Sequence, residues 1–198
     1  TWLVAGSVGE FWTRVCDLHL THWHAGQMAT LVQSGASYGK GLQRLNILRD
    51  AGRDLRAGRC YWPDEELQTV GLDRAMLCAA VRSQDMATLE RMAPVLADWH
   101  RTIQNQLHEG LCYSQMLRGR RLRLASVLPC LIGLRTLKLL RAAGTHALVQ
   151  HLKLPRKEVR LLLLRLVLGG VSDRQLQACW TSALSSSGPS ALSARIGA

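Results

Sequence analysis

The sequence is poor in the residues and motifs that many binding and catalytic sites depend on. It has one Phe and three Tyr among 198 residues, which is little material for stacking on nucleobases. It contains no zinc-finger pattern and no RNA-recognition signature, and its basic residues are scattered along the chain. Alternating strand patterns are hard to find, so the strand that precedes the nucleophile of a serine hydrolase is not expected. These absences argue against a nucleic-acid partner and against a serine hydrolase built on a sheet.

Long uninterrupted apolar runs are also missing. Residues 122–140 and 161–171 are the most apolar stretches, and Arg or Lys interrupts both of them. No signal peptide is seen. The six cysteines include no C-x-x-C pair and follow no regular spacing, which favours reduced, mostly buried thiols. We therefore expect a cytoplasmic protein.

The charge balance indicates an anionic partner. Lys and Arg number 25 against 14 Asp and Glu, a net charge of +11. Polyphosphate and anionic lipid both fit that charge. The run at residues 152–170, LKLPRKEVRLLLLRLVLGG, is basic and leucine-rich. It fits either an amphipathic helix of a bundle or a helix that adsorbs at a membrane surface, so peripheral membrane association stays open.

Hydrophobic periodicity predicts an all-α protein with one domain over residues 1–184 and a disordered tail over residues 185–198. The tail is small and polar, and no internal repeat is evident. The expected helices cover residues 2–20, 25–56, 64–71, 86–110, 111–117, 121–143, 156–168 and 173–184.

Two carboxylates four residues apart are the most informative feature. Asp50 and Asp54 share a helix face with Gly39, Gln43 and Asn46, which makes a narrow polar stripe. Two carboxylates suit Mg²⁺, which takes its other ligands from water and phosphate oxygens. Two solvated surface acids would give the same spacing. The neighbouring arginines favour a diphosphate site, since guanidinium groups bind phosphate bidentately; they are Arg49, Arg53, Arg56 and Arg59.

Three segments carry a resemblance to a known family. The run LNILRDAGRDLRAGRCYWP at residues 45–63 resembles the second aspartate-rich segment of the squalene and phytoene synthases. VAGSVG at residues 4–9 resembles the segment that precedes it there. Residues 113–137, with Tyr113 and Pro129, resemble later helices of the squalene synthase branch. The resemblance implies an isoprenoid-synthase-type helical bundle around a central apolar cavity.

The same resemblance implies an activity. It is the head-to-head condensation of two farnesyl diphosphates through presqualene diphosphate to squalene, with Mg²⁺ and NADPH. One alternative is a phytoene or dehydrosqualene synthase that needs no NADPH. A second is a noncatalytic relative that binds prenyl diphosphate or anionic lipid. Oligomeric state is open.

Roles for individual residues follow from the resemblance, position by position. Asp50 and Asp54 would bind Mg²⁺, and Arg49, Arg59 and Tyr61 would contact diphosphate oxygens. The prenyl tails would lie against Val4, Ala5, Val8 and Gly9, with Gln43 and Asn46 on the same wall. Lys153, Arg156 and Lys157 are candidates for the phosphates of NADPH.

Two departures from the family pattern stand out. No second D-x-x-x-D occurs, so we expect a chain that lacks the first helices of the fold, with its cavity open on that side. Arg53 stands where many family members carry an acid. The resemblance also predicts that Asp50 and Asp54 face the apolar cavity.

Overall fold

The computed structural model describes residues 2–185, and these form helices without a strand. The all-α prediction is therefore confirmed. In chain order the elements are a π-helix η1 (Trp2–Gly6), α1 (Ser7–His19), α2 (Met28–Arg56), α3 (Asp64–Gln68), α4 (Arg74–Ser83), α5 (Met86–Glu90), α6 (Ala93–Met116), α7 (Arg120–Ala143), a 3₁₀-helix η2 (Gly144–Leu148), α8 (Arg156–Gly169) and α9 (Asp173–Ser185).

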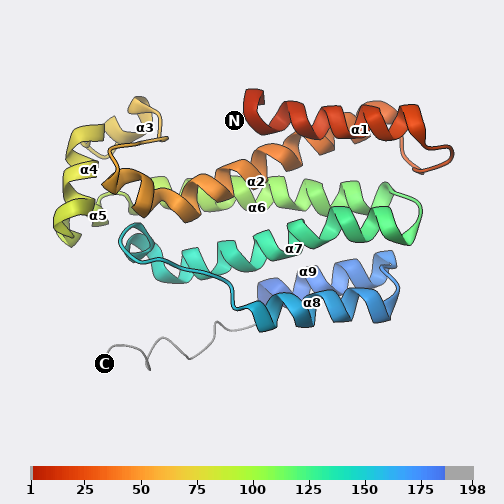
Figure 1. Ribbon diagram of the computed structural model, residues 1–198. Coiled ribbons are helices and arrows are strands. Elements are labelled where there is room, and N and C mark those ends of the chain that lie inside the picture. The colour runs from red at the N-terminus through yellow and green to blue at the C-terminus, as the bar shows by residue number, and fades with distance from the viewer. Residues whose placement is uncertain (1, 186–198) are drawn as a thin grey trace.

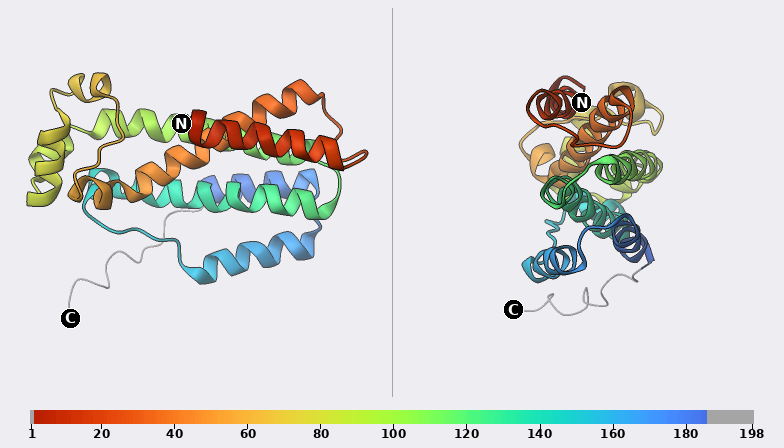
Figure 2. Two further views of the ribbon diagram at one scale, coloured as in Figure 1. Left: turned by 45° about the horizontal axis from the view of Figure 1, so that its top comes forward. Right: turned by 90° about the vertical axis from the view of Figure 1, so that its right-hand side faces the viewer.

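Three long helices, α2, α6 and α7, lie side by side and form the centre of the molecule (Figure 1). Helix α1 packs along α2 on one side, and α9 packs along α7 on the other. Helix α8 lies at the margin, at the opposite edge from α1 (Figure 2). The short helices α3, α4 and α5 gather at the end of the bundle where α2 finishes (Figure 1).

Leucine is the commonest residue of the core in the described part of the chain, and several tryptophans are buried with the leucines. Trp62 is 1% exposed and its ring centroid lies 5.4 Å from that of Trp99. The indole N–H of Trp99 donates a hydrogen bond of 2.6 Å to Glu66, which satisfies its polar atom at the edge of the core. Trp23 and Trp180 are also buried. These aromatic residues stabilise the fold and are not available for stacking on a ligand.

Three helix predictions were wrong. The single helix expected over residues 86–110 is divided, since α5 ends at Glu90 and α6 begins at Ala93. Helix α4 was not predicted, although Asp73 caps it by accepting a hydrogen bond from the Met76 amide and Leu77 and Val81 are fully buried. The break expected at Gly110 does not occur, and α6 runs through it. A Cβ at Gly110 would lie 2.4 Å from the Tyr38 ring, so glycine is there for close packing and not to end a helix.

Two further expectations concern the ends of the chain and the membrane. Ser185, the first residue of the expected disordered tail, is the last residue of α9, and residues 186–198 lie outside the described part. Within residues 2–185, no helix combines the length and the apolar character that a membrane crossing needs.

Candidate functional site

Glycines let the first segment of the chain lie directly against α2. A Cβ at Gly9 would lie 2.0 Å from the carbonyl oxygen of Gly35, and one at Gly39 would lie 2.2 Å from that of Ala5. Real Cβ atoms do not approach a backbone oxygen so closely, so only glycine permits this packing. The VAGSVG segment is thereby held against the middle of α2.

An apolar cavity of about 460 Å³ lies beside this contact, between η1, α1, α2, α6 and α7. All the residues that the resemblance assigns to the prenyl tails and to the adjoining wall line it: Val4, Ala5, Val8, Gly9, Gln43 and Asn46. Residues 35, 38, 39, 42, 43 and 46 form its α2 side. Their spacing of three and four residues is that of one helix face, so the polar stripe of the sequence is part of the cavity wall.

The cavity also contains aromatic residues that sequence reasoning did not assign to it. Trp12, Tyr38 and Tyr113 all line it. The Tyr38 hydroxyl donates to the carbonyl of Ser126 at 2.9 Å, and the Tyr113 hydroxyl lies 3.1 Å from that of Thr13. Burial raises the pKa of both phenols, so both stay protonated at neutral pH. Tyr38 lies eight residues, about two helical turns, before Asn46, and this spacing was the available signal for Tyr38.

Helix α7 contributes a proline to the same wall. Pro129 lies inside α7 and lines the cavity together with Ala125, four residues earlier. Proline has no amide hydrogen, so the carbonyl of Ala125 has no helical donor at that position.

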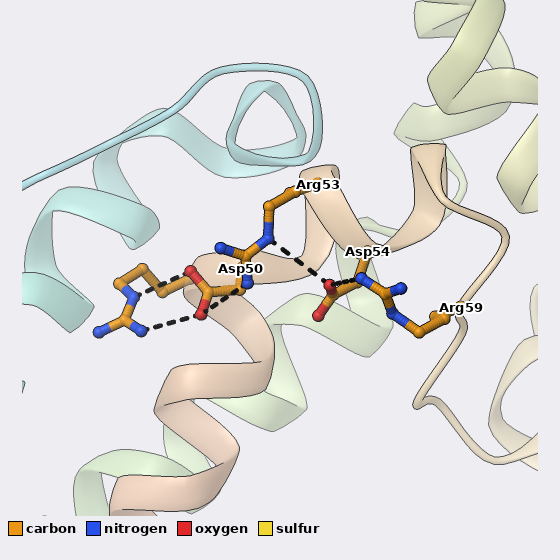
Figure 3. Close-up of polar contacts among 5 residues, drawn as sticks. Asp50, Arg53, Asp54 and Arg59 are labelled. Carbon is orange, nitrogen blue, oxygen red and sulfur yellow. Dashed lines mark hydrogen bonds and ion pairs between the residues drawn. The ribbon is translucent and has the colours of Figure 1, made fainter.

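Asp50 and Asp54 do not line the cavity, so the expectation that they face it was wrong. They lie about one and two turns beyond Asn46 toward the C-terminal end of α2, because a helix advances about 5.4 Å per turn. Figure 3 shows both carboxylates engaged by arginines. Arg49 binds Asp50 with both ends of its guanidinium, at 3.1 and 2.9 Å. Asp50 and Asp54 share a helix face with Asn46, but their neighbours are charged arginines and not the apolar residues of the cavity.

Asp54 is held from two sides. Arg59, in the loop after α2, binds its Oδ1 at 2.8 Å, and Arg53 lies 3.7 Å from the same oxygen. Arg53 also lies 3.3 Å from Asp50, so it bridges the two acids. This contact explains the arginine at position 53, where the family pattern has an acid. The positive charge of Arg53 relieves the repulsion between two carboxylates at this spacing.

The electrostatics of the cluster keep Asp50 ionised. The hydrogen bonds from Arg49 lower its pKa most, and they outweigh partial burial, which acts in the opposite direction. The charges of Arg53 and of His151 lower it further. His151 follows η2, so the segment that leads to α8 passes close to Asp50.

Comparison with known proteins identifies the chain at the family level. The model of the squalene/phytoene synthase family matches residues 1–160. The chain belongs to the squalene/phytoene synthase family. The solved structure of TcSQS, a squalene synthase, with the ligand E5700 matches with a TM-score of 0.70 and 18% identity over 91% of this chain. This likeness confirms the isoprenoid-synthase-type fold.

The chain corresponds to 49% of the TcSQS chain, so it spans about half the length of that structure. No curated protein sequence matches it. The activity, substrates and partners of a whole synthase therefore enter below as proposals.

In this squalene/phytoene synthase family member, Asp50 and Asp54 are chemically suited to provide the protein ligands on one side of a magnesium site. Within residues 2–185, no group of three or more His, Cys, Asp or Glu side chains could enclose a metal ion. Both oxygens of Asp50 are bound by arginines, whereas Oδ2 of Asp54 receives no bond from any described residue. Mg²⁺ commonly takes one or two protein carboxylates and completes its shell with water and phosphate, which this pair allows.

The other residues that the resemblance assigned to diphosphate or NADPH are exposed at the surface. Tyr61 follows Arg59 in the loop after α2 and is 51% exposed. Lys153, Arg156 and Lys157 are exposed, on the segment before α8 and in its first turn. None of the three lines the apolar cavity. Their charge and exposure would suit the phosphate groups of NADPH.

Proposed function

We propose that this protein is a prenyltransferase that condenses two farnesyl diphosphates head to head, through presqualene diphosphate, to squalene. Membership of the squalene/phytoene synthase family indicates the prenyltransferase class. One observation carries the finer proposal. A single face of α2 leads from an apolar cavity, at Gly39 and Asn46, to a cluster of ionised groups at Asp50 and Asp54. Prenyl diphosphates have the same division into an apolar tail and a charged head.

The arginines of the cluster would stabilise the leaving diphosphate. Arg49 and Arg59 have side chains that are 39% and 56% exposed, so both can turn from their aspartates toward phosphate oxygens. Negative charge grows on the diphosphate as the carbon–oxygen bond breaks, and guanidinium groups stabilise it there. Mg²⁺, held by Asp50 and Asp54, would add positive charge at the same oxygens when bound.

The cavity would protect and stabilise the carbocation. Apolar side chains exclude water, which would otherwise quench it. Trp12, Tyr38 and Tyr113 line the cavity, and aromatic side chains suit a cation because an aromatic face attracts positive charge. We assign the reductant NADPH to Lys153, Arg156 and Lys157 on the basis of their charge and exposure.

Product analysis separates the candidate functions. The chain, and the whole product of its gene, would be incubated with farnesyl diphosphate and Mg²⁺, with and without NADPH. We expect squalene only when NADPH is present. Presqualene diphosphate alone without NADPH is consistent with the proposal, whereas a C30 hydrocarbon without NADPH would indicate a dehydrosqualene synthase. Activity only with geranylgeranyl diphosphate would indicate a phytoene synthase. Binding of farnesyl diphosphate without release of diphosphate would indicate the noncatalytic relative and overturn the enzymatic proposal.

We also propose that α8 contacts the cytoplasmic membrane surface, which would give access to apolar substrates and products. Its outer face exposes Leu161, Leu164 and Leu168 by 45%, 53% and 76%. Arg156, Lys157 and Arg160 are exposed at its N-terminal end, and basic residues beside exposed leucines suit anionic lipid. Figure 2 shows α8 standing at the margin of the bundle.

Vesicle co-sedimentation tests this contact. We expect binding to vesicles of phosphatidylglycerol and phosphatidylcholine but little binding to phosphatidylcholine alone. Leu164→Gln with Leu168→Gln should lower the bound fraction several-fold. Leu18→Gln changes a leucine on α1 that is 80% exposed and should have no effect. Equal binding by all variants would exclude α8 as the contact.

A further inference from the structure

A second cavity, of about 620 Å³, lies away from the apolar one and shares no residue with it. It is formed by the first half of α6, the end of α7 and η2. Gln104 lines this cavity and Tyr113 lines the apolar cavity. Nine residues are two and a half helical turns, so the two side chains leave α6 on opposite sides. This outer cavity is therefore separate from the proposed prenyl diphosphate site.

The outer cavity is rich in cationic and hydrogen-bonding groups. Arg101, Arg141 and His146 line it together with the amides of Gln104 and Asn105. Its one acid, Glu90, already accepts a hydrogen bond of 2.6 Å from the Thr145 hydroxyl. Arg101 is paired with Asp98, but the Arg141 guanidinium makes no hydrogen bond or ion pair with any residue in the described range. Net positive charge and an unengaged guanidinium group favour an oxyanion.

His100 places an unpaired polar atom beside this cavity, which is an independent observation in favour of a ligand. Its side chain is 7% exposed, it lines the cavity, and its Nε2 has no hydrogen-bond partner among the residues of the structure. Burial, and next the charge of Arg141, lower its pKa to about 4, so the ring is neutral at pH 7. An unpaired polar atom in the interior is costly, and a neutral imidazole can donate to an anionic oxygen.

A smaller cavity adjoins the outer one and extends it with apolar surface. Its volume is about 150 Å³, and it shares His100, Gln104 and Arg141 with its neighbour. The remainder is lined mostly by apolar residues, together with one lysine: Leu134, Leu137, Lys138, Ala183 and Leu184. The shared residues thus lie between a polar space with arginines and a small apolar space.

We propose that these two cavities bind a small phosphate ester, with its phosphate at Arg141 and His100 and a short apolar group against Leu134 and Leu137. The guanidinium of Arg141 donates to the phosphate oxygens as a fork, and Arg101 adds a second positive charge. The site is independent of the prenyl diphosphate chemistry. Loss of one would leave the other intact.

Titration with phenyl phosphate tests the proposal, with inorganic phosphate as the probe for the anionic group alone. Backbone amide shifts of Gly144 and Thr145 would be followed by NMR with EDTA present, so that no metal bridges the probe to Asp50 and Asp54. We expect saturable shifts at both amides and tighter binding of phenyl phosphate than of phosphate. Arg141→Gln should weaken binding about tenfold or more, since a charged hydrogen-bonded contact is lost.

The matched control is Arg160→Gln, which removes an exposed arginine on α8 that lines neither cavity. It should bind both probes like the wild type. Thermal unfolding of both variants checks that the fold is retained. The proposal is overturned if Gly144 and Thr145 do not respond, or if Arg141→Gln binds as tightly as Arg160→Gln. Equal affinity for the two probes would exclude the apolar part of the site.

Discussion

Asp54→Asn is expected to lower the turnover of farnesyl diphosphate at least about 100-fold while leaving the fold in place, because it removes a carboxylate from the diphosphate site. Asp54 is the acid with an oxygen left free by its arginines, so it is the better candidate for Mg²⁺. Asn keeps the shape and can still accept from Arg59. The ion pairs of Asp54 with the exposed Arg53 and Arg59 contribute little to stability, so the melting temperature should stay close to that of the wild type.

Steady-state rates and the dependence of rate on Mg²⁺ concentration would measure this effect in the full-length protein. Asp64→Asn is the matched control, since Asp64 also pairs with an arginine, Arg74, but lies on α3 outside the site. It should keep wild-type turnover. If Asp54→Asn were as active as Asp64→Asn, the aspartate pair would be a structural ion-pair cluster and not a diphosphate site.

Gly9→Ala is expected to destabilise the protein by about 3 kcal/mol, because its Cβ would meet a backbone oxygen that cannot move away independently. That oxygen, of Gly35, would lie 2.0 Å from the new atom. Helix α1 must then shift away from α2, which also opens the apolar cavity. For a domain of this size the melting temperature should fall by roughly 10 °C, measured by circular dichroism.

Gly133→Ala separates this contact from the general effect of filling space in a helix. A Cβ at Gly133 would meet only side-chain methyl groups, with Leu45 nearest at 3.1 Å. The small repacking is offset by the higher helix propensity of alanine, so the melting temperature should change little. Equal stability of the two variants would mean that α1 does not lie against α2 through Gly9.

Much of the fold could be predicted from sequence because it depends on local pattern. The 3.6-residue periodicity located the long helices. Helix α4 was missed, although its cap at Asp73 was visible in the sequence. The prediction of a helix end at Gly110 was wrong because this glycine leaves room for the ring of Tyr38. Tyr38 lies 72 positions earlier in the chain, so a local sequence pattern does not show the contact.

The residues of the candidate site were predictable in part for the same reason. Helical spacing joined Gly39, Gln43 and Asn46 to Asp50 and Asp54, and the family resemblance added Val4 to Gly9. The structure places the first three along the cavity and the acids beyond it. Helical spacing shows which residues share a face. It does not show which other segments of the folded chain pack against each turn of that face.

The sequence by itself determined that the chain is helical, that it belongs with the squalene and phytoene synthases, and that its polar stripe lies on one face of a helix. Only the tertiary structure decided which turns of that face border the apolar cavity. It also decided that Arg49, Arg53 and Arg59 bind the two aspartates, and that Tyr38 and Tyr113 enter the cavity wall. The reason is physical: periodicity is a property of one helix, whereas a cavity and an ion-pair cluster require segments that meet only when the chain has folded.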